Sequence, residues 1–144
     1  MKKTVSLFII IINLLSCNAS KDLFYAAMPQ EIKSITFENW NGGRMESGSG
    51  TVFIIEFEKP LRSNVRIEKI YYKNLETEFV QVNETKFKAN FHHNTIFQEF
   101  QTSAIATKNF NLNDNEAIIE YQKNNKTYFY KCSNIKEIPM IMYE

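Results

Sequence analysis

The most unusual concentration of residue types in this chain is a glycine-rich segment beside its only tryptophan. All four glycines lie between Gly42 and Gly50, directly after Trp40. Glycine adopts backbone conformations that other residues avoid and lets a ligand approach the main chain closely. With Trp40 as an aromatic face and Arg44 as a fixed charge, this segment could bind a carbohydrate, a peptide or a partner protein. The simpler interpretation is a connection between two strands, because loops accumulate glycine in any case.

The other residues that could do chemistry give little support to metal binding or catalysis. His92 and His93 are the only histidines, and adjacent residues of a strand point to opposite faces, so the two would not share one metal ion. Asn109 to Glu120 matches some ligand positions of a calcium loop, but Asp114 occupies the position that needs glycine. An asparagine-rich turn is therefore expected there.

No sequence motif of a nucleophilic enzyme accompanies any serine or cysteine of the chain. We therefore expect no catalytic residue, no metal and no cofactor. The alternative is a small hydrolase or metal-dependent enzyme of the periplasm or cell surface that uses His92 or His93.

The elements that must position these residues are β-strands, because apolar residues recur at every second position from Ile32 onward. Phe53, Ile55 and Phe57 line one face of such a strand. A change of phase near Glu68–Lys69 predicts a bulge. The expected strands are Ile32 to Trp40, Thr51 to Glu58, Val65 to Tyr72, Glu78 to Val82, Thr85 to Phe91, two between Ala117 and Cys132, and Ile135 to Tyr143. About eight short strands are typical of an antiparallel two-sheet sandwich, immunoglobulin-like or similar.

One hairpin can be predicted residue by residue. Asn124–Asn125 can form a two-residue type I′ turn, since asparagine tolerates the left-handed conformation. Counting outward from this turn predicts cross-strand pairs on both faces: Tyr121 with Tyr128, Ile119 with Tyr130, Ala117 with Cys132, Gln122 with Thr127, and Glu120 with Phe129. This register makes Cys132 a small buried hydrophobic residue and not a catalytic thiol. A second hairpin is expected to turn at Asn83–Glu84.

Two stretches leave helix and strand as open alternatives. Residues 20–28 contain the apolar run Leu23 to Met28, which could be a short helix or an edge strand. Residues 95–104 could form a short helix that carries Phe97 and Phe100, or an irregular strand.

The beginning of the chain has the organisation of an export signal. Lys2 and Lys3 precede an apolar stretch from Val5 to Leu15, and this stretch has only about half of the roughly 20 residues that a transmembrane helix needs. The residues Leu14-Leu15-Ser16-Cys17 at its end resemble the lipobox of bacterial lipoproteins. An ordinary secretory signal with a coincidental cysteine is the alternative.

The resemblance implies cleavage before Cys17, transfer of diacylglycerol to its thiol and acylation of the new amino terminus. Two or three acyl chains would hold the protein stably at a membrane, where a single chain would not. Asn18 stands where an aspartate would suggest retention at the inner membrane, so the resemblance implies the outer membrane. Cys132 would then have no partner for an intrachain disulfide.

The expected organisation is a signal peptide over residues 1–16, a lipidated N-terminus with a short tether over residues 17–30, and one β domain over residues 31–144. Cleavage leaves 128 of the 144 residues, which suits one domain. It also removes two lysines and leaves 15 basic side chains against 16 acidic ones, so no attraction to nucleic acid is expected. The expected function is that of an envelope lipoprotein with a non-enzymatic binding domain, whose partners are the membrane, through Cys17, and an envelope protein or glycan.

Overall fold

The computed structural model describes residues 25–42, 48–93 and 104–139 of the chain. The strands of one sheet are β1 (Ile32–Asn41), β2 (Ser49–Phe57), β5 (Val80–Gln81), β6 (Lys86–His93) and β10 (Lys136–Ile138). Those of the other are β3 (Val65–Tyr72), β4 (Leu75–Glu78), β7 (Ala104–Ile105), β8 (Ala117–Lys123) and β9 (Lys126–Cys132).

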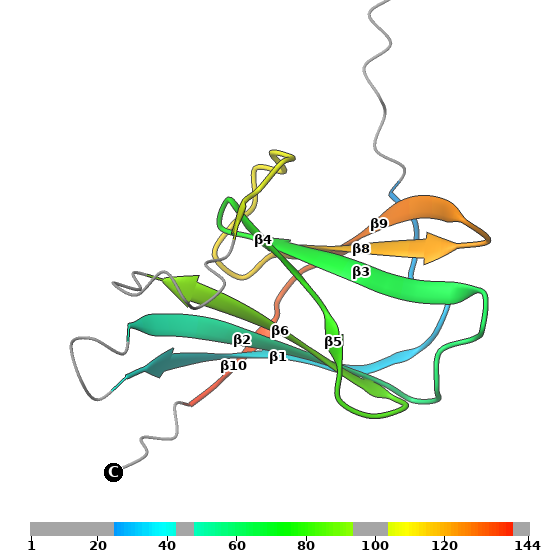
Figure 1. Cartoon of the computed structure of the whole chain (residues 1–144), viewed down its shortest axis with the longest axis horizontal. Helices are drawn as coiled ribbons and strands as arrows, with labels where there is room; N and C mark the ends of the chain where they lie inside the picture. Colours follow the sequence, from blue (N-terminus) through cyan, green and yellow to red (C-terminus); the bar gives the residue numbers. More distant parts are fainter. Residues whose placement is uncertain (1–24, 43–47, 94–103, 140–144) are drawn as a thin grey trace, which may run out of the picture.

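The two sheets form two layers that face each other (Figure 1). One, which we call the β1 sheet, has the strand order β10-β1-β2-β6-β5, and the other, the β3 sheet, has the order β7-β4-β3-β8-β9. The predicted fold class, a mainly antiparallel two-sheet β-sandwich, is confirmed. None of the described residues is helical, so this part of the chain contains no helix that could cross a bilayer.

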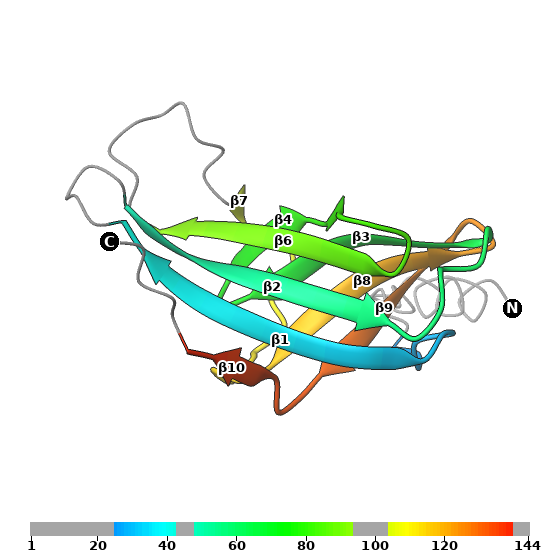
Figure 2. The ribbon, with the colours of Figure 1, turned by 90° about the horizontal axis from the view of Figure 1, so that it is seen from below.

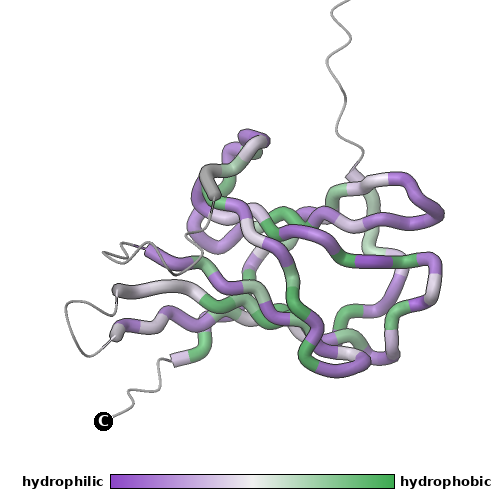
Figure 3. Tube along the Cα trace, viewed as in Figure 1, coloured by the Kyte–Doolittle hydropathy of each residue, from purple (hydrophilic) through white to green (hydrophobic). Residues whose placement is uncertain are grey.

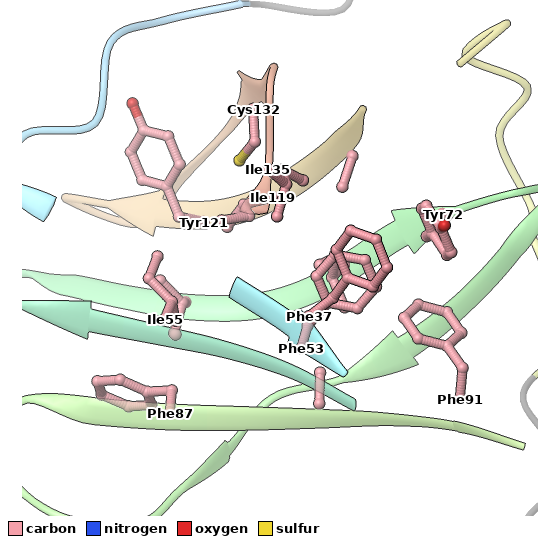
Figure 4. Close-up of a cluster of buried hydrophobic side chains, with 14 of the residues drawn as sticks. Phe37, Phe53, Ile55, Tyr72, Phe87, Phe91, Ile119, Tyr121, Cys132 and Ile135 are labelled. Atoms are coloured by element: carbon pink, nitrogen blue, oxygen red, sulfur yellow. The ribbon is translucent and has the colours of Figure 1, made fainter. Parts of the chain in front are cut away.

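The core forms because alternate residues of each strand point between the sheets, as the period-two pattern predicts. Figure 3 shows this alternation of hydrophobic and hydrophilic residues along the strands. Phe53, Ile55 and Phe57 of β2 are each 1% exposed. In Figure 4 the rings of Phe53 and Phe91 point from the β1 sheet toward Tyr72 of the β3 sheet, and the ring centroids of Phe53 and Tyr72 are 4.8 Å apart.

The hairpin of β8 and β9 has the predicted register at every predicted pair, from Tyr121 with Tyr128 to Ala117 with Cys132. Asn124 and Asn125 form the turn with φ angles of 52° and 61°. Cys132 is 3% exposed, and burial raises the pKa of its thiol to about 12. The thiol is therefore protonated at neutral pH, as expected of a buried hydrophobic residue.

The expected strand from Glu78 to Val82 is wrong as a single element. Glu78 pairs with Lys69 in the β3 sheet, whereas Val80 pairs with Lys88 in the β1 sheet. The chain crosses between the layers at Phe79, whose amide donates to the carbonyl of Glu68 over 2.9 Å. The hairpin predicted at Asn83–Glu84 is therefore confined to β5 and β6.

The bulge predicted in the third expected strand is confirmed, since the pairing of β3 with β8 shifts between Ile67 and Lys69. The last expected strand, Ile135 to Tyr143, is only partly described, since residues 140–143 lie outside the described part. Its described portion contains β10 (Lys136–Ile138), which runs parallel to β1 in a sheet whose other strand pairs are antiparallel. The reason is that the chain leaves β9, changes layer through residues 133–135 and then runs alongside β1 in the same direction.

The two stretches left open as helix or strand are only partly described. Residues 25–28 are not helical, so the helix alternative is wrong for this part, and an isolated parallel bridge joins Tyr25 to Phe129 of β9. Ala104 begins β7, while residues 95–103 and 20–24 lie outside the described part. The expected asparagine-rich turn is present, with the amide of Asn111 donating to Oδ1 of Asn109 over 3.2 Å. The predicted signal peptide and lipobox also lie outside the described residues.

The outer faces of the two sheets differ in what covers them. Ala106, Phe110 and Leu112 pack on Tyr71, Ile118 and Phe129 and so cover part of the outer face of the β3 sheet. Figure 2 looks onto the outer face of the β1 sheet, and no described segment crosses in front of β1, β2 and β6. The outer face of the β1 sheet is therefore the surface that this part of the chain leaves open.

Candidate functional site

The candidate site lies where β1 ends, β2 begins and β6 ends. Trp40 of β1 pairs with Gly50 of β2, and Gly50 pairs with His92 of β6. The three residues form one row across the outer face of the β1 sheet. This row lies at one end of the sandwich, and the β8–β9 turn lies at the other (Figures 1 and 2). The described chain starts at Tyr25, on the side of the β8–β9 turn.

Trp40 packs on the backbone of Gly50. A Cβ atom added to Gly50 would lie 2.5 Å from both Cε2 and Nε1 of Trp40, so the indole lies directly over this glycine. The ring of His92 meets the indole edge-on, with 5.6 Å between centroids. An aromatic side chain that covers a cross-strand glycine stabilises a sheet. The half-buried Trp40 therefore has a packing role and also keeps part of its ring at the surface.

Replacing Gly50 with alanine is expected to lower the free energy of unfolding by about 1–3 kcal/mol, as in other overpacked sites. The new methyl group would overlap the indole of Trp40 and the carbonyl oxygen of Phe91. Urea unfolding measures the loss. In a Trp40→Ala background, which lacks the indole, Gly50→Ala should cost less stability but still some, because the overlap with the carbonyl oxygen of Phe91 remains. A Gly50→Ala protein as stable as the unchanged chain would contradict the placement of the indole.

Arg44, which was predicted to bind a ligand together with Trp40, lies outside the described residues. At the base of that loop the amide of Gly42 donates to the carbonyl of Gly48 over 2.9 Å. Gly48 has a φ angle of 68°, which disfavours any residue with a side chain. Trp40, the candidate binding residue from the sequence, lies at this strand end, and the structure places Gly50 and His92 next to it.

The other face of the same strand ends carries a chain of polar residues that the sequence analysis missed. Thr51 Oγ1 lies 2.7 Å from Oδ1 of Asn39 and 3.1 Å from Nε2 of His93. Asn39 in turn donates from Nδ2 to Glu137 Oε1 over 2.8 Å. Asn39 lies two residues after Phe37, and Thr51 lies two residues before Phe53, so both point to the inner face. Extending the alternation of buried residues to the strand ends would have predicted both as inward-facing polar residues.

The directions of these hydrogen bonds decide what the inner polar chain can do. The carboxylate of Glu137 accepts, so the amide of Asn39 presents its Oδ1 to Thr51. The hydroxyl of Thr51 gives its one proton to that oxygen and must accept from Nε2 of His93. Burial lowers the pKa of His93, and the charges of Lys73 and His92 lower it further. His93 is thus a neutral donor here, and Thr51, which is 2% exposed, lacks the base that a nucleophile needs.

Neither histidine forms part of a metal cluster in the part of the chain that the structure describes. Within those residues no group of three His, Cys, Asp or Glu side chains could hold a metal ion. His92 contacts Trp40 on the outer face, and His93 contacts Thr51 on the inner face. The opposite orientations expected for neighbouring strand residues are therefore observed.

These observations define a two-sheet β-sandwich. The row of Trp40, Gly50 and His92, which we call the aromatic row, lies at one end of its open outer face. No protein-family model, no curated protein and no solved structure matches this chain.

Proposed function

We propose that this chain is a lipid-anchored protein of the cell envelope whose β-sandwich is a non-enzymatic binding module for an envelope protein or glycan. The observation that carries the proposal is the row of Trp40, Gly50 and His92, which holds an aromatic surface on the open face of the β1 sheet. Solvent-accessible aromatic residues at a rigid strand end are suited to recognition, because little side-chain freedom is lost on binding.

The position of the row supports the same function. An anchor on Cys17 would precede Tyr25 by eight residues, a length of at most about 30 Å when fully extended. The described chain begins against β9, near the end with the β8–β9 turn, and the Trp40 row lies at the opposite end. An anchored domain of this kind would carry its aromatic row away from the point of attachment. The resemblance of Leu14 to Cys17 to a lipobox supports the anchor, and Asn18 after the cysteine supports attachment to the outer membrane.

The alternative of a small hydrolase finds no support among the described contacts. Of the two histidines that this alternative would use, His93 contacts the hydroxyl of Thr51, but the hydrogen-bond direction is opposite to the one that activates a nucleophile.

Variants at Cys17 and at Trp40 test the two halves of the proposal. Cys17→Ser should release the exported protein from the membrane fraction, and intact mass of the unchanged protein should show an acylated chain that starts at Cys17. Trp40→Ala, alone and with Arg44→Ala, should weaken capture of an envelope protein or glycan about tenfold or more. Trp40→Phe, which keeps an aromatic ring over Gly50, separates loss of binding from loss of folding. A Cys17→Ser form that stays membrane-bound contradicts the anchor, and unchanged capture by a folded Trp40→Ala protein contradicts the site.

A further inference from the structure

The outer face of the β1 sheet carries an ordered set of side chains beyond the aromatic row. The strand registers place Lys136, Thr36, Ile54, Lys88 and Val80 in one row that crosses all five strands. A second row, between this one and Trp40, contains Ile138, Glu38, Val52 and Asn90. No described segment covers the central strands of this face (Figure 2). The face therefore has aliphatic residues at its middle, aromatic rings at one end and charges around them.

The charges on this face have a positive excess. Glu56 bridges Lys33 and Lys86, at 2.7 and 3.7 Å. Lys88 and Lys136 are exposed and form no ion pair with any described residue. The four rows from Trp40 to Glu56 contain Lys86, Lys88 and Lys136, and Lys33 joins them through its ion pair with Glu56, so four lysines face two glutamates, Glu38 and Glu56. The face complements a ligand that carries spaced negative charges.

The size of the face suits a narrow ligand better than a second globular domain. Four rows spaced by two residues extend about 20 Å along the strands, and five strands extend about 19 Å across them. The area of about 400 Å² is half of the roughly 800 Å² per partner that a stable protein interface buries. One extended chain that runs along β1 and β2, from Trp40 to the space between Lys88 and Lys136, fits this area.

We infer that the outer face of the β1 sheet binds an acidic linear polysaccharide, with Trp40 and His92 against sugar rings and Lys88 and Lys136 on its carboxylates. This inference deepens the proposed function and rests on it. The lysines lie three strand spacings apart, about 14 Å, on either side of Thr36 and Ile54. Thr36 and Asn90 present a hydroxyl and an amide for sugar hydroxyls.

A sugar chain suits this face better than an acidic peptide does. The main chain of β1, β2 and β6 is paired on both sides, so the face offers side chains and no free backbone groups. A peptide lying on such a face would lose water from its own amides without gaining backbone partners. Sugar hydroxyls point outward around the ring and can stay hydrated while the apolar ring face contacts an aromatic side chain.

The probe that tests this inference is an oligogalacturonate of about ten sugars, titrated calorimetrically into the purified full chain in detergent. Lys88→Ala/Lys136→Ala should weaken binding at least tenfold, and binding should fall as salt is raised. The matched control is Lys123→Ala/Lys126→Ala, a cross-strand lysine pair of the β3 sheet, which should bind like the unchanged protein. A neutral maltooligosaccharide of equal length should bind more weakly.

Absence of oligogalacturonate binding, an equal loss in the control pair, or equal binding of polyglutamate would overturn the inference. The same variants separate it from the proposed function. If Trp40→Ala abolishes capture of an envelope protein while Lys88→Ala/Lys136→Ala does not, the binding module stands and the polysaccharide is discarded.

Discussion

Replacing Phe53 with alanine is expected to lower the free energy of unfolding by about 3–5 kcal/mol, the range seen when a buried phenylalanine is removed from a core. Phe53 is 1% exposed and lies at the centre of the ring cluster in Figure 4. Its centroid is 5.6 Å from that of Phe37 and 5.7 Å from that of Phe91. With Tyr72 at 4.8 Å, the ring also joins the two sheets. The cavity would therefore open between the layers and affect both.

Urea unfolding at neutral pH, followed by far-UV circular dichroism, measures this loss. Val52→Ala is the matched control, because Val52 is the next residue of β2 but points to the half-buried outer face. Val52→Ala should lower the free energy of unfolding much less than Phe53→Ala does. A Phe53→Ala protein no less stable than the Val52→Ala protein would show that the alternation along β2 has been assigned to the wrong faces.

The parts of the fold that could be predicted are those set by neighbouring residues in the chain. Asparagine at both positions of a two-residue turn is a strong local signal, and it sets the pairing of every residue in the β8–β9 hairpin. The alternation of Phe53, Ile55 and Phe57 likewise predicts which face is buried without knowledge of what covers it.

The parts that could not be predicted depend on residues that lie far apart in the chain or on weak turn signals. The turn between β3 and β4 uses Lys73 and Asn74 at φ angles of 46° and 62°, and lysine gives no hint of a left-handed conformation. The crossing at Phe79 is decided by a hydrogen bond to Glu68 in the bulge of β3. The local sequence pattern therefore predicts neither the turn between β3 and β4 nor the crossing at Phe79.

The candidate site shows the same division. Trp40 and its glycine neighbourhood are visible in the sequence, but the row with His92 exists only because β2 brings β1 and β6 together. The inner chain from Glu137 to His93 joins residues of four strands. Lys88 and Lys136 come to one row through a parallel β10, which the sequence did not predict.

Replacing Glu76 with glutamine is expected to remove up to about 3 kcal/mol of stability at neutral pH and to reduce the acid sensitivity of the fold. Glu76 is 5% exposed. Its Oε1 accepts from Lys69 Nζ at 2.8 Å, and its Oε2 accepts from the amide and hydroxyl of Thr107 at 2.8 and 2.7 Å. Burial alone would raise the pKa of this carboxyl, but the hydrogen bonds from Lys69 and Thr107 outweigh burial and lower the pKa to about 2.

The sign of the pH effect follows from the lowered pKa. A carboxyl whose pKa is lower in the folded than in the unfolded protein stabilises the fold above the unfolded pKa, 4.5 here, and loses this contribution as the pH falls toward 2. Urea unfolding at a series of pH values should show a larger loss in the unchanged protein than in Glu76→Gln. The variant keeps the contributions of Glu56 and Glu116, whose pKa values are lowered by hydrogen bonds from Lys33 and from the amide of Asn113. The control is Glu78→Gln, an exposed residue of the same strand, which should keep the loss. If Glu76→Gln follows the unchanged protein at every pH, the stabilising contacts of Glu76 are absent in solution.

The same variant also tests how the outer face of the β3 sheet is covered. Thr107 is held by Glu76 and lies next to Ala106, whose amide donates to the carbonyl of Asn74 over 2.8 Å. Because Ala106 and Phe110 pack on the buried cluster of Tyr71, Ile118 and Phe129, loss of the Glu76 contacts should loosen this segment before the sandwich unfolds. Hydrogen exchange should therefore quicken at Ala106 and Thr107 in Glu76→Gln, while the amides of the β8–β9 hairpin keep their protection. Equal acceleration in both places would mean that Glu76 stabilises the whole sandwich and not the covering segment in particular.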